Sequence, residues 1–278
     1  MIKKIIRALT GKYSLHGEVS LASDADDVAA AVIALPTLGA QVEYLGQCRN
    51  FRVDQQKPEF NAFLAKVVAA NPKRVLEIGG RRGGSSFLLS LAAPDATIVS
   101  MDIDYGRRRL NRLQKLCKGR SIEFWQGDSH SAATAERVQE WAGSDGIDVL
   151  FIDGDHTYDG AKADFCMYLP MVKQSGIIAM HDIQPDFRSR FNVPTLRWAG
   201  GVPELWKDIK AAGFSCEDLI SDEWQDGYGI GAVTKSADDE ERIQQIRRIQ
   251  SAAASAAIEA FKPQPGGYHG RHLDLRRC

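Results

Sequence analysis

The chain has 278 residues, of which 44% are hydrophobic and 26% are charged, a composition typical of a globular protein with one sizeable core. Its 35 lysines and arginines nearly balance 36 aspartates and glutamates, which argues against nucleic acid or an anionic membrane as the main partner. The five cysteines show no metal-binding spacing, and no apolar run is long enough to span a bilayer. We therefore expect a cytoplasmic protein with reduced thiols.

A regular alternation of helices and strands begins with apolar residues at helical spacing over residues 60–70. The predicted strands cover residues 74–78, 97–101, 122–125, 149–152 and 176–180; the helices between them begin near residue 85 and cover residues 108–117, 132–141 and 160–168. This α/β alternation predicts a Rossmann-like, doubly wound, mostly parallel sheet between two helical layers, a three-layer αβα architecture. Two later runs, 214–219 and 229–233, predict a terminal antiparallel hairpin at one sheet edge.

The flanking segments differ from this central region, residues 56–235. Residues 1–55 combine a basic start, a predicted helix over 24–35 and a polar stretch, and we expect them to cap the site or to form an oligomer contact. Residues 236–278 begin with an acidic helix start and end in a basic tail. The helix between them places apolar residues on one face, at Ile243, Ile246, Ile249, Ala253, Ala257 and Phe261. That face packs on its own domain or forms a homo-oligomer contact.

A glycine-rich turn follows the first predicted strand, where residues 75–86 read VLEIGGRRGGSS. Arg81 stands where a dinucleotide fingerprint needs its second glycine, which disfavours a nicotinamide oxidoreductase, and no lysine follows Gly84 as a P-loop requires. The spacing that remains is E-x-G-x-x-x-G-x-S, at Glu77, Gly79, Gly83 and Ser85. This pattern resembles motif I of the class I S-adenosylmethionine (SAM) methyltransferases.

A second pattern combines DVLFIDGDHTY at residues 148–158 with GIIAMHDI at residues 176–183. Together they resemble a bacterial subgroup of class I methyltransferases related to sugar and natural-product O-methyltransferases of the macrolide and cephamycin pathways. The resemblance covers roughly residues 55–235, and it makes residues 56–235 the expected methyltransferase domain. Ser175 departs from it, since a glycine is usual at that turn.

The predicted cofactor site follows from the motif and from carboxylates at neighbouring strand ends. Asp102 ends the second strand, where a carboxylate can accept hydrogen bonds from both ribose hydroxyls. Asp128 and Ser129 follow the third strand, and Asp128 can bind the adenine amino group. Glu77 holds the glycine turn or the amino-acid end of SAM. With Gly79, Gly83 and Ser85 these residues form the predicted SAM site, and a rim of carboxylates suits the positive charge of a sulfonium.

The resemblance also implies a metal site in the metal-dependent relatives, and its positions here are Asp153, His181 and Asp182. His181 stands where a carboxylate is usual. Two carboxylates and an imidazole could still bind Mg²⁺ or another divalent ion, although Mg²⁺ prefers oxygen ligands alone. His181 can instead act as the general base that removes the proton of an acceptor hydroxyl, the role we favour, with Asp153 beside it. His156 is a second candidate base, or forms a helix-start pair with Asp155.

The predicted activity is transfer of a methyl group from SAM to a hydroxyl of a sugar or small natural product. The predicted acceptor is therefore a small molecule or a glycan. The alternative is a noncatalytic SAM-binding subunit that partners another enzyme, for example a hydroxylating one. Residues 184–206 are rich in aromatics and arginines, which suits a sugar ring, an anionic acceptor or an ordinary lid. The basic run over residues 107–120 is interpreted as a solvated helix face and not as an RNA-binding surface.

Overall fold

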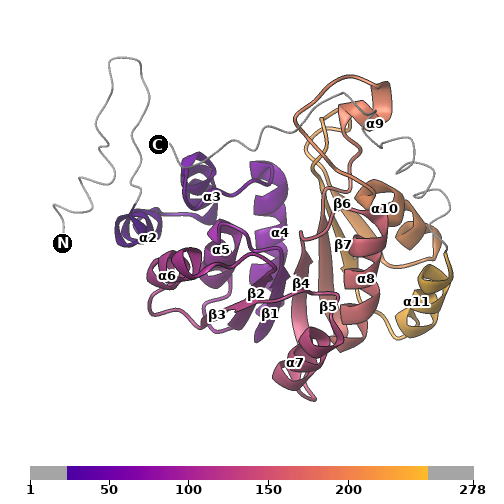
Figure 1. Cartoon of the computed structure of the whole chain (residues 1–278), viewed down its shortest axis with the longest axis horizontal. Helices are drawn as coiled ribbons and strands as arrows, with labels where there is room; N and C mark the ends of the chain where they lie inside the picture. Colours follow the sequence, from indigo (N-terminus) through magenta and orange to yellow (C-terminus); the bar gives the residue numbers. More distant parts are fainter. Residues whose placement is uncertain (1–23, 250–278) are drawn as a thin grey trace.

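The computed structural model describes residues 24–249, which form a seven-stranded sheet flanked by helices (Figure 1). The strands are β1 (Arg74–Ile78), β2 (Thr97–Asp102), β3 (Ile122–Gln126), β4 (Ile147–Ile152), β5 (Val172–His181), β6 (Cys216–Leu219) and β7 (Ile230–Thr234). Their order is β3-β2-β1-β4-β5-β7-β6. The first five strands pair in parallel, and β7 pairs antiparallel with both β5 and β6. The predicted mostly parallel sheet with a terminal hairpin is confirmed.

Helices cover both faces of the sheet, because successive residues of each strand point to opposite sides. Val75 and Phe151 belong to one apolar core, and Leu76 and Leu150 belong to the other. The first core is covered by α2 (Ala25–Ile33), α3 (Leu38–Gln47), α4 (Lys57–Ala70), α5 (Gly84–Ala92) and α6 (Arg107–Leu116). The second is covered by α7 (Ala132–Ala142), α8 (Tyr158–Tyr168), α10 (Val202–Ala211) and α11 (Asp239–Arg248). The three predicted layers are thus confirmed.

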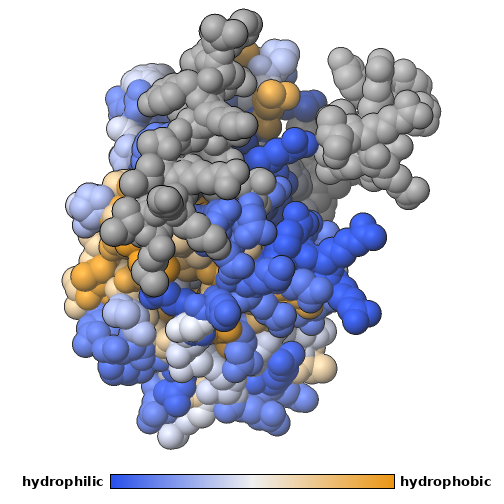
Figure 2. Space-filling view, turned by 90° about the vertical axis from the view of Figure 1, so that its left-hand side faces the viewer, coloured by the Kyte–Doolittle hydropathy of each residue, from blue (hydrophilic) through white to orange (hydrophobic). Residues whose placement is uncertain are grey.

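The basic run over residues 107–120 lies mainly on α6, as an amphipathic helix. Its leucines, Leu113 and Leu116, are buried, whereas Arg107, Arg108 and Arg112 are exposed. Figure 2 shows hydrophilic side chains over much of the face of the molecule that carries this helix. No helix within residues 24–249 is both long enough and apolar enough to cross a membrane.

Several element boundaries differ from the sequence predictions. The helix predicted over 24–35 ends at Ile33, and α3 and α10 were not predicted. Strand β5 begins at Val172, four residues before its predicted start, and Ser175 within it has a positive φ of 62°. That backbone conformation explains why glycine suits this position. Ile243 and Ile246 of α11 are buried as expected, whereas Ala253, Ala257, Phe261 and the basic tail lie outside the described residues.

Candidate active site

A cavity of about 830 Å³ opens at the carboxyl ends of the parallel strands, the edge where open α/β sheets bind ligands. Residues that follow β1, β2 and β3 line one part of it, which we call the motif end: Gly79, Ser85, Asp102, Asp128, Ser129 and His130. Residues from the N-terminal segment and from the loops after β5 and β6 line the other part, which we call the outer end: Arg52, Asp54, Gln55, Leu196, Arg197, Trp198 and Tyr228. Asp153, His156, His181 and Asp182 lie between the two ends.

The glycine turn after β1 is packed too closely for side chains. Gly79 has a φ of 91°, and a Cβ there would collide with the carbonyl oxygen of Asp153. Gly83 has a φ of 74°, precedes α5, and would press a Cβ against Leu113. The turn therefore presents bare backbone and the N-terminus of α5 to the cavity, an arrangement suited to ligands that accept hydrogen bonds. Gly79 and Ser85 line the cavity, whereas Gly83 does not.

Glu77 lies beneath this turn and does not line the cavity. Its Oε2 accepts hydrogen bonds from the hydroxyls of Ser86 and Ser100, and the Ser100 hydroxyl also contacts that of Tyr105 at 2.8 Å. Burial raises the pKa of Glu77, although the serine hydroxyls oppose the shift. Of the two roles expected for Glu77, this geometry matches support of the turn.

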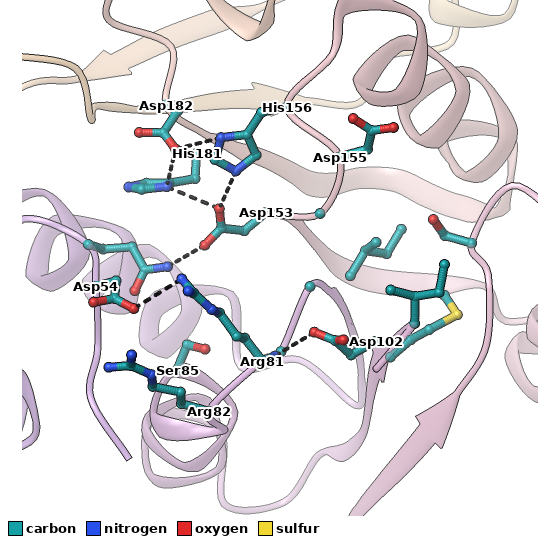
Figure 3. Close-up of a pocket in the computed structure, with 18 of the residues that line it drawn as sticks. Asp54, Arg81, Arg82, Ser85, Asp102, Asp153, Asp155, His156, His181 and Asp182 are labelled. Carbon is teal, nitrogen blue, oxygen red and sulfur yellow. Dashed lines mark hydrogen bonds and ion pairs between the residues drawn. The ribbon is translucent and has the colours of Figure 1, made fainter. Parts of the chain in front are cut away.

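The two predicted carboxylates of the motif end both line the cavity. Asp102 accepts the backbone N–H of Arg81 on Oδ2 and that of Asp104 on Oδ1, each at 2.8 Å (Figure 3). Asp128 is exposed and accepts the N–H of His130 at 2.9 Å. Each carboxylate is therefore held by backbone donors and keeps further lone pairs for a ligand.

A buried carboxylate lies under the loop after β3. Asp164 of α8 is fully buried, and its Oδ1 lies 3.3 Å from Nε2 of His130. The hydroxyl of Tyr168, also on α8, donates to the carbonyl of Ser129 at 2.7 Å. Burial raises the pKa of Asp164 to about 6, against the opposing effects of Ser129 and His130. Helix α8 thus supports this loop from below.

Two carboxylates and two imidazoles form a compact cluster in the cavity wall (Figure 3). Nδ1 of His181 lies 3.1 Å from both Asp153 Oδ1 and Asp182 Oδ2. Nε2 of His156 lies 3.5 Å from Asp153 Oδ1, and its Nδ1 lies 3.4 Å from Asp182 Oδ2. Nδ1 of His156 also lies 2.9 Å from the carbonyl oxygen of Trp198. The sequence-predicted trio of Asp153, His181 and Asp182 is therefore brought together.

The cluster shifts the pKa of its members in opposite directions. Burial favours the neutral form of Asp153, but the charge of His181 and the contacts of both imidazoles hold the pKa of Asp153 well below its usual range. Burial alone would lower the pKa of His156, yet Asp153 and Asp182 raise it to about 9. The same two carboxylates raise the pKa of His181 well above its ordinary value. In the absence of another cation, both imidazoles are held in their charged form.

The outer end brings together residues that are distant in the sequence. The side-chain amide of Gln55 donates to Oδ2 of Asp153. The ring of Trp198 stacks on His156 with centroids 5.6 Å apart, and the Tyr228 ring lies 6.0 Å from that of His181. Arg52, Asp54 and Gln55 thus line the cavity, and the cap expected of residues 1–55 stays a prediction.

A family model described as a methyltransferase domain, Methyltransf_24, matches residues 76–183. This segment runs from β1 through the glycine turn to the end of β5, and it contains every predicted site residue. Residues 76–183 therefore match a methyltransferase domain in sequence. Uncharacterized protein R132 of Acanthamoeba polyphaga mimivirus is 39% identical over 70 residues. Those residues are 25% of this chain and 29% of that relative, so the chain spans less than a third of it.

Solved structures show the same methyltransferase fold. An O-methyltransferase from Bacillus cereus in complex with S-adenosylhomocysteine (SAH) has a TM-score of 0.54 and 18% identity, and the match covers 76% of this chain and 96% of that one. TomG of Streptomyces achromogenes, involved in tomaymycin synthesis and solved with SAM, has a TM-score of 0.51 and 16% identity over 77% of this chain and 97% of that one. At these identities the likeness is one of fold.

The donor atoms of the carboxylate–imidazole cluster are close enough to share a cation. One atom each from Asp153, His181 and Asp182 lie within 4.8 Å of one another. Two carboxylates and one imidazole fit a divalent ion that accepts nitrogen as well as oxygen, such as Mn²⁺, better than they fit Mg²⁺. The predicted donor set is therefore chemically adequate for a divalent cation.

Some cavity residues of the methyltransferase had only a weak signal in the sequence, or none. Arg197 and Trp198 lie in the aromatic and arginine-rich stretch that suggested an acceptor region. Gln55 and Tyr228 belong to polar segments without a motif, and nothing in their local sequence indicates that they approach Asp153 and His181. His156 could be identified from the sequence as a second candidate base, because it follows the end of a predicted strand as His181 does.

Proposed function

We propose that the protein is an O-methyltransferase that transfers the methyl group of SAM to a hydroxyl of a sugar or small natural product. The observation that carries this proposal is the position of the carboxylate–imidazole cluster, in the same cavity as the glycine turn and beside it. In the proposed complex, Asp102 binds the ribose, Asp128 and Ser129 bind the adenine, and Gly79 and Ser85 contact the methionine portion. Gly83 shapes the turn and Glu77 supports it from below.

Methyl transfer is an in-line displacement at a carbon that the sulfonium already activates. The main task of the protein is to hold the acceptor oxygen, methyl carbon and sulfur in line, which can supply about 7–11 kcal/mol. The acceptor hydroxyl must also lose its proton, because a neutral hydroxyl is a weak nucleophile. The cluster is the part of the cavity that can accept that proton.

His156 is better placed than His181 to act as the base, although the sequence pattern favoured His181. A carbonyl can only accept a hydrogen bond, so the contact with Trp198 fixes the proton of neutral His156 on Nδ1 and leaves Nε2 as the acceptor. His181 is 6% exposed, its Nδ1 faces two carboxylates, and its Nε2 is buried without a partner within residues 24–249. In this proposal, Asp182, whose Oδ2 lies 3.4 Å from Nδ1 of His156, orients that ring, and His181 holds Asp153 and Asp182 in place.

A divalent cation held by Asp153, His181 and Asp182 would orient the acceptor oxygen and lower the pKa of its hydroxyl. Neutralising the two carboxylates in this way would also bring the pKa of His156 down from about 9 toward its ordinary value.

Free thiols at Cys48, Cys117, Cys166 and Cys216 support the cytoplasmic location expected from the sequence.

The test combines cofactor binding with transfer. We expect SAH to bind in isothermal titration, and radiolabelled SAM to give a methylated product from a panel of sugars and phenols. His156→Ala should leave SAH affinity nearly unchanged and lower transfer by about 10²–10⁴-fold. Rigorous chelation should abolish transfer, and Mn²⁺ or Mg²⁺ should restore it.

Each outcome separates one part of the proposal from the others. SAH binding without transfer to any acceptor would favour the noncatalytic partner subunit. Full transfer after chelation would exclude the cation, and full transfer by His156→Ala would remove His156 from the mechanism. In that last case His181→Ala becomes the decisive variant.

A further inference from the structure

The cavity is lined by both negative and positive side chains. Its six aspartates lie at the motif end, in the cluster, at Asp54 and at Asp155, and its four arginines are Arg52, Arg81, Arg82 and Arg197. Among the described residues only Asp54 pairs with any of these arginines, namely Arg52 and, at 3.5 Å, Arg81. Arg82 and Arg197 have no carboxylate within ion-pair distance in residues 24–249. SAM brings one carboxylate of its own, so one arginine is left without an anion.

Arg197 lies close to the proposed acceptor position. Its guanidinium carbon lies 4.3 Å from the centre of the Tyr228 ring, and that ring lies 6.0 Å from the ring of His181. The guanidinium and the His181 ring are thus both neighbours of the same tyrosine ring. Stacking on a ring uses the face of a guanidinium and leaves its N–H groups free to bind an anion.

Tyr228 is held in a backbone conformation that is unfavourable for tyrosine. Gly227, Tyr228 and Gly229 have consecutive positive φ angles of 74°, 63° and 81°. The left-handed conformation costs a residue with a Cβ roughly 1–2 kcal/mol. Tertiary contacts maintain it, since the N–H of Tyr228 donates to Asp182 at 3.1 Å and the N–H of Gly229 donates to the buried Glu59 at 2.9 Å. Strain of this kind at a cavity wall indicates a functional position.

Large apolar side chains beside Arg197 are exposed to solvent. Leu196 is fully exposed and Trp198 is 59% exposed, yet both line the cavity. Trp198 stacks nearly parallel to His156, with an angle of 24° between the rings, so it offers a flat face beside the proposed base. Exposed apolar side chains grouped at a cavity mouth are typical of a ligand-binding surface.

We propose that the methyl acceptor is an anion, whose carboxylate or phosphate binds Arg197 while its hydroxyl faces His156 and the Asp153–Asp182 cluster. Its body lies against Trp198 and the Tyr228–Arg197 stack. This inference rests on the proposed function and narrows it to acceptors that carry a negative charge. A guanidinium is well suited to the task, because its planar fork binds such anions with two parallel hydrogen bonds.

The test compares charged and neutral versions of the same molecule on SAH-loaded protein with Mn²⁺ present. Protocatechuate and its amide form one pair, and glucuronate and glucose form the other. We expect the charged member of at least one pair to bind about tenfold or more tightly than its neutral partner in isothermal titration. The pair that responds also shows whether the acceptor body is aromatic or a sugar.

Variants assign the preference to Arg197. Arg197→Gln should remove the difference between charged and neutral probes and leave SAH affinity unchanged, and Arg197→Lys should restore part of it. Arg190→Gln is the matched control, since Arg190 donates to the carbonyl of Glu223 at 2.8 Å and does not line the cavity.

The two proposals can fail separately. Absence of SAH binding would overturn the proposed function. If SAH binds, any of three results would overturn the anionic acceptor alone. These are equal affinities within both pairs, no binding of either charged probe, and a preference for the charged probe that survives Arg197→Gln.

Discussion

The motif end and the outer end of the cavity are built in different ways. At the motif end, Gly79, Asp102 and Asp128 lie at the carboxyl end of a parallel strand or within two residues of it, so the order of strands in the sheet brings them together. At the outer end, Gln55 meets Asp153 from 98 residues away, and Arg197 stacks on Tyr228 from another loop. The first arrangement depends on local backbone geometry and the second on tertiary packing. A shared cofactor can therefore be combined with a pocket particular to one chain.

Two carboxylates on neighbouring strands show the same contrast at the scale of single residues. Glu77 lies on β1 and Asp153 follows β4, and both are largely buried. Glu77 has only hydroxyl donors, so burial raises its pKa, whereas the imidazoles around Asp153 hold its pKa low. We conclude that Asp153 is the carboxylate that carries charge within the cavity, and that Glu77 supports the turn.

The largest effect is expected from Asp153→Asn, which breaks the link between the two ends. It removes the charge that holds His156, His181 and Gln55 in one arrangement. Methyl transfer should fall by about 10²–10⁴-fold, while SAH affinity changes far less. Radiolabel transfer and isothermal titration measure the two quantities.

Asp155→Asn is the matched control for that variant. Asp155 lines the cavity two residues further on, but its carboxylate caps Thr157 at 2.8 Å and takes no part in the cluster. A comparable loss of transfer in both variants would show that charge in this loop matters and that the cluster does not.

The next effect in size is expected from Asp102→Ala, which tests the motif end alone. Each proposed ribose contact is a charge-assisted hydrogen bond worth roughly 1.5–3 kcal/mol, so the loss of even one of them should lower SAH affinity by about tenfold to a hundredfold. Transfer at saturating SAM should be largely retained. Asp104→Ala is the control, because Asp104 is exposed and does not line the cavity. Unchanged SAH affinity in Asp102→Ala would exclude the ribose site.

The arrangement of the motif end could be predicted in large part from the sequence, because each feature there has a local cause. The apolar run of β1, the close packing at Gly79 and the strand-end position of Asp102 can each be recognised within a few residues. Ser175 is a smaller example, since its φ of 62° explains why a glycine is usual at that turn. Local steric requirements of this kind are visible in a single sequence.

The outer end could not be predicted in the same way. Helix α10 has apolar residues at helical spacing, Val202, Leu205, Trp206 and Ile209, but it lies in a stretch that was interpreted as an acceptor region or lid. The position of Tyr228 depends on Glu59, which is 170 residues from Gly229 in the sequence. The choice between His156 and His181 depends on which ring nitrogen meets a carbonyl, and only the folded geometry supplies that information.

The smallest effect is expected from Asp164→Asn. This variant tests whether the motif end also contains a buried charge that lowers the stability of the folded protein. The pKa of Asp164 is about 6 in the folded protein against 3.8 for the free side chain. The folded state therefore takes up a proton between these values that the unfolded chain does not, so the stability of the wild-type protein should rise as the pH falls through this range. Above pH 6 the buried carboxylate is charged and lowers stability.

Asp164→Asn removes that charge, and it should raise the free energy of unfolding by about 1–2 kcal/mol at pH 8. The gain should disappear near pH 3, where Asp164 is largely protonated in both states. Urea denaturation followed by circular dichroism at the two pH values measures it, with the exposed Asp159→Asn on the same helix as control. A variant less stable than wild type at pH 8 would mean that the contact between Asp164 and the His130 imidazole outweighs the cost of burial. The motif end would then depend on a buried carboxylate–imidazole contact as the central cluster does, and the contrast between the two ends would be reduced.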